Sequence, residues 1–232
     1  RSTLFPYTTL FRSEDLAMKK WEAVIFDMDG TLFDTETISM KAWKRVGEKL
    51  HLPTSDTFIL SLIGRTRKDQ QVIFDTYMPK GWPQEEACRL HTLYKKEEKQ
   101  QNGVPLMGDV KGLLEIVKNK GYRIAMATSA SAEDVEFNLH HAGIAPYFEI
   151  IVNEEMISQG KPAPDVYLKT AEKLGVQPQK CLVVEDSLNG VRSAYRANTT
   201  VVMIPDKVPP TKEIETMCDY ILNSLDELKN MI

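Results

Sequence analysis

The sequence predicts an α/β fold, a doubly wound parallel sheet with an inserted α-helical cap domain. Three observations lead to this prediction. Short apolar runs alternate with helical patterns through the second half of the chain, the first apolar run ends abruptly at two carboxylates, and the segment 34–103 behind it contains no long strand-like run. Alternating strands and helices are typical of a parallel sheet with right-handed crossovers.

Two helices of the predicted sheet domain have recognisable ends. The amphipathic helix that starts near Val110 is followed by Gly121, in the position where a glycine commonly terminates a helix. The next helix starts with Ser131 and Asp134 at the spacing of a capping residue and an acid three positions later, and it stops at Gly143. The expected strands are the apolar runs 23–26, 121–127, 148–152, 181–184, 199–204 and 219–222.

The segment 34–103 is rich in charged helix formers and is expected to fold as a helical bundle of its own. Met40, Trp43, Val46 and Leu50 recur at helical spacing, which indicates a stripe that faces a core rather than a cofactor site. The expected helices of this cap domain are 41–50, 55–62, 68–77 and 84–101.

Residues 1–17 fit nothing that follows them. They contain two arginines and several hydroxyls, as a degenerate targeting peptide would, but they lack a continuous apolar core and a small-residue cleavage site. Met18, just before the first strand, looks like a natural start. We therefore interpret 1–17 as a cloning or read-assembly artefact, with a disordered native tail as the alternative, and we expect the catalytic core at 18–33 and 104–232.

Composition narrows the class of partner. The 232 residues carry a formal net charge of −4, which offers no basic field to nucleic acid or to an anionic membrane surface. The apolar runs are too short to span a bilayer, and the three scattered cysteines are typical of a reducing cytosol. We expect a cytoplasmic monomer that binds a small phosphorylated metabolite, with no nucleic acid or membrane partner.

The first apolar run ends at Asp27 and Asp29, with Gly30 directly behind them. Residues two apart in an extended chain point the same way, so both carboxylates can face the crevice beyond the strand, where open α/β sheets bind their ligands. Two close like charges are costly unless a cation or a shared proton neutralises them, and Mg²⁺ is the ion that suits carboxylate oxygens. A plain Asp-Gly turn after a strand is equally compatible with this motif alone.

Three further motifs follow at corresponding places. The second apolar run ends at Thr128 and Ser129, Lys161 stands in a loop that two prolines fix before a helix, and a third run ends at Glu185 and Asp186. This order of motifs resembles the haloacid dehalogenase (HAD) superfamily of phosphoryl-transfer enzymes, specifically its phosphatase and phosphomutase branch with a helical cap after the first strand. The resemblance extends from about residue 18 to the C-terminus and includes all four motifs.

The resemblance implies a HAD-like Rossmannoid core and roles for four residues. Asp27 would attack phosphorus to form an aspartyl-phosphate, which divides one hard displacement into two easier ones. Asp29 would protonate the departing alkoxide and then, as a carboxylate, activate the water that hydrolyses the intermediate. Thr128 and Lys161 would bind the equatorial phosphoryl oxygens.

The resemblance also implies a Mg²⁺ cofactor. Its ligands would be the Asp27 carboxylate, the Asp29 carbonyl and Asp186. Glu185 would ligate the ion directly or through water, and a role as a neighbouring acid or as a charge at a helix N-terminus is the equal alternative.

Ser129 and Arg67 are candidates for substrate binding. Ser129 fits equally well as the start of the turn that follows the strand. Arg67 lies in the cap loop after the pair Ile63-Gly64, a loop that in this family can face the substrate, and a solvated loop is the alternative reading.

Asp29 favours phosphate-ester chemistry, because dehalogenases of the superfamily lack an acid at that position and its ion-pumping ATPases have threonine there.

The similar β-phosphoglucomutases carry a histidine twelve residues after the nucleophile, where Ser39 stands here, and the four histidines of this chain lie elsewhere. We therefore expect a Mg²⁺-dependent phosphomonoesterase that acts on a sugar phosphate or a phosphoglycolate-like metabolite. The alternatives are a mutase of the β-phosphoglucomutase type and a non-catalytic regulatory module that binds a phosphorylated metabolite.

Overall fold

In a computed structural model, residues 21–63 and 67–232 are described, without the side chains of 67–69. The predicted tail 1–17 lies outside the described residues. Within them the chain divides into two compact units, which are residues 21–33 with Leu106–Ile232, and Asp34–Pro105. We call the first the sheet unit and the second the helical unit.

The described part of the sheet unit contains one six-stranded sheet in the order β3-β2-β1-β4-β5-β6. All neighbouring strands are parallel, and the register pairs Ile25 of β1 with Ala125 of β2 and with Val183 of β4. The predicted fold class, an α/β protein with a doubly wound parallel sheet, is confirmed. The strands are β1 (Ala23–Phe26), β2 (Arg123–Ala127), β3 (Ile150–Val152), β4 (Cys181–Glu185), β5 (Thr200–Met203) and β6 (Tyr220–Ile221).

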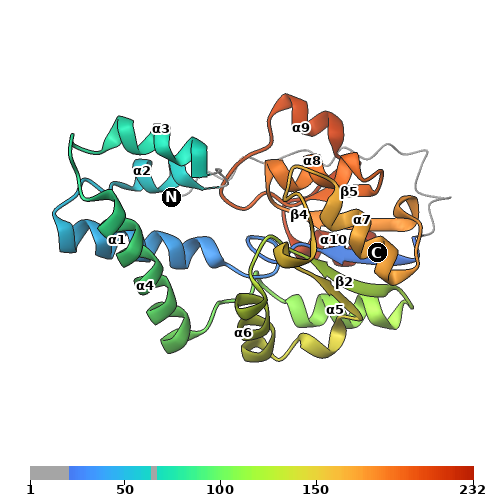
Figure 1. The fold of residues 1–232 in the computed structure, drawn as a ribbon. Coiled ribbons are helices and arrows are strands. Elements are labelled where there is room, and N and C mark those ends of the chain that lie inside the picture. Colours follow the sequence, from blue (N-terminus) through green and yellow to red (C-terminus); the bar gives the residue numbers. More distant parts are fainter. Residues whose placement is uncertain (1–20, 64–66) are drawn as a thin grey trace. The chain divides into compact units, whose positions relative to one another are not determined.

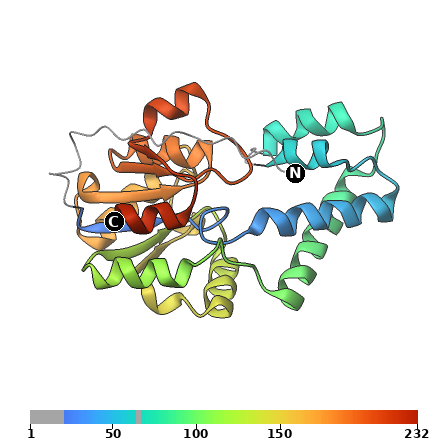
Figure 2. The ribbon, with the colours of Figure 1, turned by 180° about the vertical axis from the view of Figure 1, so that it is seen from behind.

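Helices cover both faces of this sheet. Helices α5 and α10 lie side by side over one face, as Figure 2 shows, and α7 and α8 pack against the other (Figure 1). The helices of the sheet unit are α5 (Val110–Asn119), α6 (Ala132–Ala142), α7 (Asp165–Leu174), α8 (Leu188–Arg196), α9 (Lys212–Met217) and α10 (Leu225–Met231).

The core explains why the central strands are continuous apolar runs. Every residue of β1 and β4 is buried, because a strand with helices on both faces has no side exposed to solvent. On one face Ile25 and Val183 pack with Val166 of α7 and Val191 of α8. Each buried side chain of this size contributes about 1.5–3 kcal/mol.

The predicted helix ends are also confirmed. The Ser131 hydroxyl accepts a hydrogen bond from the Asp134 backbone N–H at 3.2 Å, and Gly143 ends α6 in the left-handed conformation. Gly121, just beyond α5, has a φ of +80°, which side chains with a Cβ rarely adopt.

The helical unit packs around aromatic rings. The Trp43 ring meets Phe58 edge-on, with the ring centroids 5.6 Å apart, and Phe74 at 5.8 Å. Within the predicted core-facing stripe, Trp43 and Val46 are buried, and Met40 and Leu50 pack against the same cluster. The helices are α1 (Thr35–Leu50), α2 (Asp56–Leu62), α3 (Arg67–Tyr77) and α4 (Gln84–Asn102).

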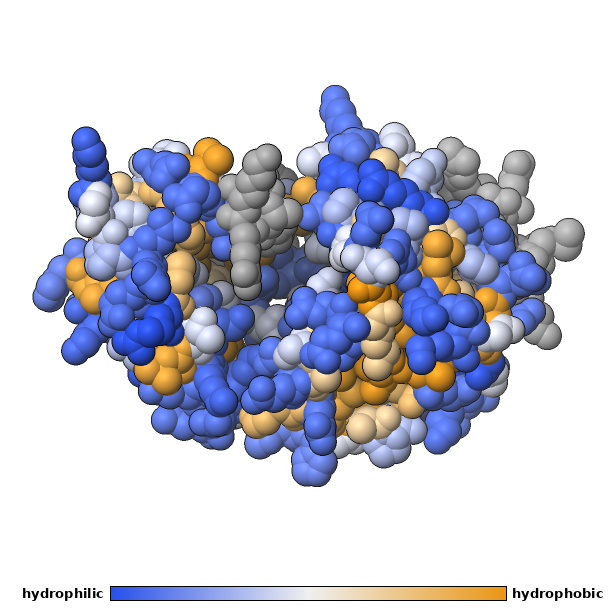
Figure 3. Space-filling view, viewed as in Figure 1, coloured by the Kyte–Doolittle hydropathy of each residue, from blue (hydrophilic) through white to orange (hydrophobic). Residues whose placement is uncertain are grey.

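Figure 3 shows the polarity of one face of each unit. On that face hydrophilic residues predominate, and hydrophobic residues gather in a patch on the sheet unit. None of the helices in the described part of the chain has the length and apolar character that a membrane crossing requires.

Candidate active site

The candidate site lies at the carboxyl edge of the sheet, where the strand order reverses. After β1 the chain builds β2 and β3 on one side, and it then crosses to β4 on the other side of β1. Open α/β sheets bind ligands at such a switch point. Asp27 directly follows β1 and Glu185 ends β4, so two adjacent strands supply these carboxylates.

Lys161 connects the two carboxylates. Its Nζ donates to Asp27 Oδ1 at 2.5 Å and to Glu185 Oε1 at 2.6 Å. The side chains are almost inaccessible, with 8% of Lys161, 7% of Asp27 and none of Glu185 exposed. Removing one partner of a buried ion pair typically costs about 3–5 kcal/mol, because it leaves the other charge uncompensated. The three residues therefore depend on one another for their burial.

Glu185 is held by more than this lysine. The Tyr167 hydroxyl donates to its Oε1 at 2.5 Å, while Oε2 accepts from the Ser187 hydroxyl at 3.1 Å and from the backbone N–H groups of Asp186 and Ser187 at 3.1 and 3.2 Å. Both carboxylate oxygens are thus occupied. Glu185 is therefore the best anchored acid of the cluster.

Two glycines let the backbone approach the acids. A Cβ on Gly30 would lie 2.3 Å from Asp186 Oδ2, and a Cβ on Gly190 in α8 would lie 1.9 Å from the Glu185 carboxyl group. Gly30 also has a φ of +79°. The turn after β1 and the first turn of α8 can therefore surround the carboxylates only if these residues lack side chains.

The electrostatics reflect an excess of negative charge. Burial raises the pKa of Asp27 to about 8, the charge of Lys161 opposes this rise, and Glu185 and Asp29 add to it. Burial likewise raises the pKa of Asp186, with the charges of Glu185 and Asp27 acting in the same direction. Burial alone would lower the pKa of Lys161, but the two carboxylates outweigh it and hold that pKa well above its usual range.

The acidic residues could hold a metal ion. One carboxylate oxygen each from Asp27, Glu185 and Asp186 lies within 4.8 Å of the others. Lys161 supplies one positive charge against these three carboxylates, so a divalent cation would restore the balance without requiring protonation. An all-oxygen donor set is the kind that Mg²⁺ prefers. The residues present therefore fit a hard divalent ion.

The other predicted site residues of the sheet unit are arranged as follows. Asp29 is half-buried, two residues after Asp27, and its charge acts on that carboxyl group. Thr128 is fully buried after β2, and its hydroxyl accepts from the Ala130 N–H at 3.0 Å, so it stabilises the local turn. Ser129 is exposed. No hydrogen bond recorded among the described residues connects Thr128 or Ser129 to the Asp27–Lys161 cluster.

The predicted residues of the helical unit lie on α1 and α3. Arg67 begins α3, and its side chain is outside the described part of the chain. Ser39 lies on α1, and its hydroxyl contacts Nε2 of His91 on α4 at 3.2 Å. The His91 imidazole therefore lies beside Ser39, the residue twelve positions after Asp27. His91 is 52 residues away along the chain, so sequence spacing gave no sign of this pair.

Tyr167 was missed at the sequence level. Besides its hydrogen bond to Glu185, its ring centroid lies 5.2 Å from Lys161 Nζ. The only signal in the sequence is an aromatic residue within the apolar stripe of α7, which also predicts an ordinary core position.

The chain belongs to the haloacid dehalogenase-like hydrolase family, whose model matches residues 24–204. It is 33% identical over 180 residues to the phosphorylated carbohydrates phosphatase of Thermotoga maritima, covering 76% of this chain and 81% of the relative. It is 27% identical over 224 residues to the phosphoglycolate phosphatase of Nitrosococcus oceani, covering 93% and 98%. The predicted family and the predicted phosphatase class of enzyme are thereby confirmed.

A solved structure of a mutase has the same fold. The β-phosphoglucomutase of Clostridium difficile is 25% identical, with a TM-score of 0.67, and the similarity covers 90% of this chain and 93% of that one. Some relatives are much longer than the segment that matches this chain. In the bifunctional riboflavin kinase/FMN phosphatase of Arabidopsis thaliana, 34% identical over 118 residues, the match spans 50% of this chain but only 31% of the relative.

The contact between Gly190 and Glu185 generates a stability prediction. In an ordinary helix, glycine to alanine stabilises by about 1 kcal/mol. Gly190→Ala is expected instead to destabilise by about 1–3 kcal/mol, because the new methyl group collides with a carboxylate that cannot move away from its partners. The measurement is the free energy of unfolding in urea. Gly160→Ala is the matched control, since no atom lies within 4 Å of its added Cβ. A stabilising Gly190→Ala would show that Glu185 is not fixed.

Proposed function

We propose that this protein is a Mg²⁺-dependent phosphomonoesterase that hydrolyses a small phosphorylated metabolite through a phosphorylated Asp27. The observation that carries the proposal is the buried Lys161 ammonium, which holds Asp27 at 2.5 Å beside two further carboxylates at the switch point of the sheet. Burying these charges together costs free energy, and groups with perturbed pKa values cluster at functional sites.

In the proposed reaction Asp27 is the nucleophile. Phosphate esters resist attack because negative oxygens shield the phosphorus, so an enzyme gains most by positioning the nucleophile and neutralising charge. The strand end and Lys161 fix Asp27 Oδ1, which leaves Oδ2 as the attacking oxygen. The attack forms an Oδ2–P bond and breaks the bond from phosphorus to the ester oxygen, which departs as an alkoxide.

Asp29 is proposed as the general acid and base. It is half-buried and lies two residues from the nucleophile. As the acid it protonates the departing alkoxide, and as the resulting carboxylate it takes a proton from the water that attacks the phosphorylated Asp27. Lys161 and Thr128 are proposed to stabilise the negative charge on the phosphoryl oxygens.

The proposed metal ligands are the Asp27 and Asp186 carboxylates and the Asp29 carbonyl oxygen. When bound, Mg²⁺ neutralises charge on the phosphoryl group. Because Lys161, Tyr167 and Ser187 already engage both oxygens of Glu185, we assign this residue to positioning Lys161 rather than to direct ligation. It was one of the predicted metal ligands.

The proposed substrates are sugar phosphates or phosphoglycolate-like metabolites. Relatives named for phosphorylated carbohydrates and for phosphoglycolate support these two classes. A purely regulatory module that binds a phosphorylated metabolite is disfavoured, because binding alone does not require both a nucleophile and an acid.

A second candidate function is phosphoryl transfer of the β-phosphoglucomutase type. The contact between His91 and Ser39 favours it, because it brings an imidazole to the helix position at which the similar mutases carry a histidine. Burial, with the positive charge of Lys95, lowers the pKa of His91 to about 4, so the ring is neutral at pH 7.

Asp27→Asn is expected to lower kcat for phosphate release by at least about a thousandfold, or about 4 kcal/mol of barrier, because an amide of similar shape replaces the nucleophile. Asp226→Asn, at an exposed carboxylate in α10, is the matched control and should retain full activity. Phosphate release is followed with an aryl phosphate and with a panel of phosphorylated metabolites. Turnover by Asp27→Asn within tenfold of the unmodified enzyme would exclude Asp27 as the nucleophile.

Mg²⁺ is expected to raise the thermal midpoint, by an amount that corresponds to about 2.7 kcal/mol when its concentration is a hundred times its dissociation constant. Asp186→Asn should abolish this shift, yet it should leave the metal-free protein at least as stable, because it relieves repulsion between carboxylates. Differential scanning calorimetry with EDTA and with added Mg²⁺ tests both points, with Asp226→Asn as the control. An undiminished shift in Asp186→Asn would place the ion elsewhere.

The two candidate functions predict different products. Incubation with β-glucose 1-phosphate and a trace of glucose 1,6-bisphosphate should release phosphate and glucose if water is the final acceptor. Accumulation of glucose 6-phosphate, observed by phosphorus NMR, would instead establish the mutase.

A further inference from the structure

Lys161 reaches the candidate site from the loop that precedes α7. Two hydrogen bonds close this loop on itself. The Ala163 N–H donates to the Gly160 carbonyl at 3.0 Å, and the Gln159 N–H donates to the carboxylate of Asp165, the first residue of α7, at 3.2 Å. Both bonds are local, so they shape the loop without fixing it against the sheet.

Helix α8 attaches the loop to the rest of the sheet unit. The Ser193 hydroxyl donates to the Ala163 carbonyl at 2.6 Å, and the Arg196 guanidinium donates to the Pro162 carbonyl at 2.8 Å. The two side chains thus hold the two carbonyls that follow Lys161 along the chain. The backbone from which the lysine side chain starts is therefore fixed by α8.

Ser193 is the buried one of these two donors. It is fully buried, whereas Arg196 is exposed. Its neighbours on the buried face of α8 are Gly190, Val191 and Ala194, which have no polar side chain. Water can replace an exposed donor easily, but not a donor at a buried position. Ser193 is therefore the stronger of the two attachments.

The start of the same helix holds the carboxylate that pairs with Lys161. The Ser187 hydroxyl accepts from the Gly190 N–H at 3.0 Å, which caps α8, and it donates to Glu185 Oε2 at 3.1 Å. Ser187 and Ser193 are six residues apart, or about 9 Å along a helix axis. One rigid helix thus sets the separation between Glu185 and the loop that carries Lys161.

The proposed reaction makes this attachment important. A lysine ammonium is a point charge on a flexible four-carbon stem, so its position depends on its partners and on the backbone that carries it. When Asp27 is phosphorylated, its carboxylate becomes a neutral ester-like group and the ion pair with Lys161 weakens. Glu185 and the loop backbone then keep the ammonium group in place.

We propose that Ser193 is a positioning residue for phosphoryl transfer, because its hydroxyl fixes the Lys161 loop on α8 and thereby holds the ammonium group beside Asp27. The proposal deepens the proposed phosphatase function and rests on it. Ser193 acts through Lys161, which serves the phosphoryl group that all phosphate esters share. Loss of the hydroxyl therefore lowers the rate of the chemical step by the same factor for every ester.

The kinetic test compares Ser193→Ala with Thr170→Val. Thr170 is the matched control, because its buried hydroxyl donates to the Val166 carbonyl within α7 at 2.7 Å, away from the loop. The substrates are phenyl phosphate and glucose 6-phosphate, assayed well below the thermal midpoint of each variant. Ser193→Ala should lower kcat at least about tenfold on both substrates and leave KM within about twofold. Thr170→Val should keep kcat within about twofold.

Arg196→Gln is a second variant in case Ser193→Ala folds poorly. It removes the exposed attachment and should lower kcat about threefold, while Arg192→Gln, whose guanidinium donates to Glu213 instead of the loop, should retain full activity. Unchanged kcat in both Ser193→Ala and Arg196→Gln would overturn the proposal. Equal losses in Ser193→Ala and Thr170→Val would also overturn it, because they would trace the loss to stability.

These results would leave the phosphatase function intact, because the unmodified enzyme still releases phosphate. Failure of the phosphatase function gives a different result, which is no phosphate release from any ester by the unmodified protein.

Hydrogen exchange supplies a test that does not depend on turnover. The amides of Gln159 and Ala163 report on the loop, since both donate hydrogen bonds within it. In Ser193→Ala they should exchange at least about tenfold faster, while the amides of β4 keep their protection. Thr170→Val should leave the loop amides unchanged. Loop exchange in Ser193→Ala equal to that of the unmodified protein would contradict the attachment.

Discussion

The structure of the candidate site depends on a single ammonium group surrounded by carboxylates. Within the described residues, Lys161 is the cation that forms ion pairs with both Asp27 and Glu185. Asp186 adds a third acid to the cluster. Two unit charges 4 Å apart interact by about 4 kcal/mol at an effective dielectric constant of 20, so repulsion among the acids is large compared with the net stability of a domain. The site is therefore stable only with a cation or with protons to compensate.

The surrounding fold fixes this arrangement through its polar and apolar contacts. Helix α7 brings Tyr167 to Glu185, and the start of α8 supplies the Ser187 hydroxyl and two backbone N–H groups to the same carboxylate. Because Glu185 is held so completely, it can position Lys161, and Lys161 in turn positions Asp27. Rigid placement of the nucleophile is what phosphoryl transfer requires of a protein, since positioning and electrostatics provide most of the catalysis.

Much of this could be predicted from the sequence because it depends on local patterns. Fully buried strands appear as apolar runs, and the residues at their carboxyl ends, Asp27 and Glu185, meet at one edge of a parallel sheet. The ends of the helices were predicted less accurately. Helix α1 begins at Thr35 rather than at residue 41, because the Asp34 side chain caps it by accepting from the Thr37 N–H at 3.1 Å. An acid followed by polar residues gives only a weak signal for such a cap.

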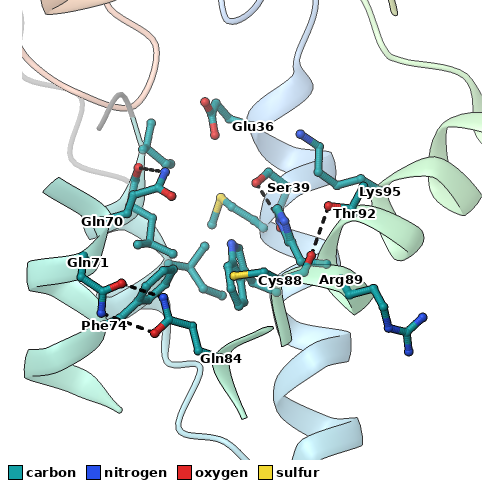
Figure 4. Close-up of a pocket in the computed structure, with 16 residues that line it drawn as sticks. Glu36, Ser39, Gln70, Gln71, Phe74, Gln84, Cys88, Arg89, Thr92 and Lys95 are labelled. Carbon is teal, nitrogen blue, oxygen red and sulfur yellow. Dashed lines mark hydrogen bonds between the residues drawn. The ribbon is translucent and has the colours of Figure 1, made fainter. Parts of the chain in front are cut away.

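The contacts between distant helices could not be predicted in this way. Tyr167 reaches Glu185 from a helix whose stripe reads as ordinary core, and His91 meets Ser39 across 52 residues of sequence. These pairs form only when two helices pack in one particular register, and no periodicity in either helix encodes the register of its partner. The helical unit also contains a cavity of about 930 Å³ (Figure 4). This cavity belongs to the same category, since four helices contribute to its lining.

The two units differ in the kind of recognition that their residues allow. The acids and the lysine of the sheet unit suit a phosphoryl group, which every phosphate ester shares, so they cannot distinguish one leaving group from another. The lining of the cavity in the helical unit, as far as the structure describes it, is rich in groups that both donate and accept hydrogen bonds, and such groups reject a ligand that leaves them unpaired.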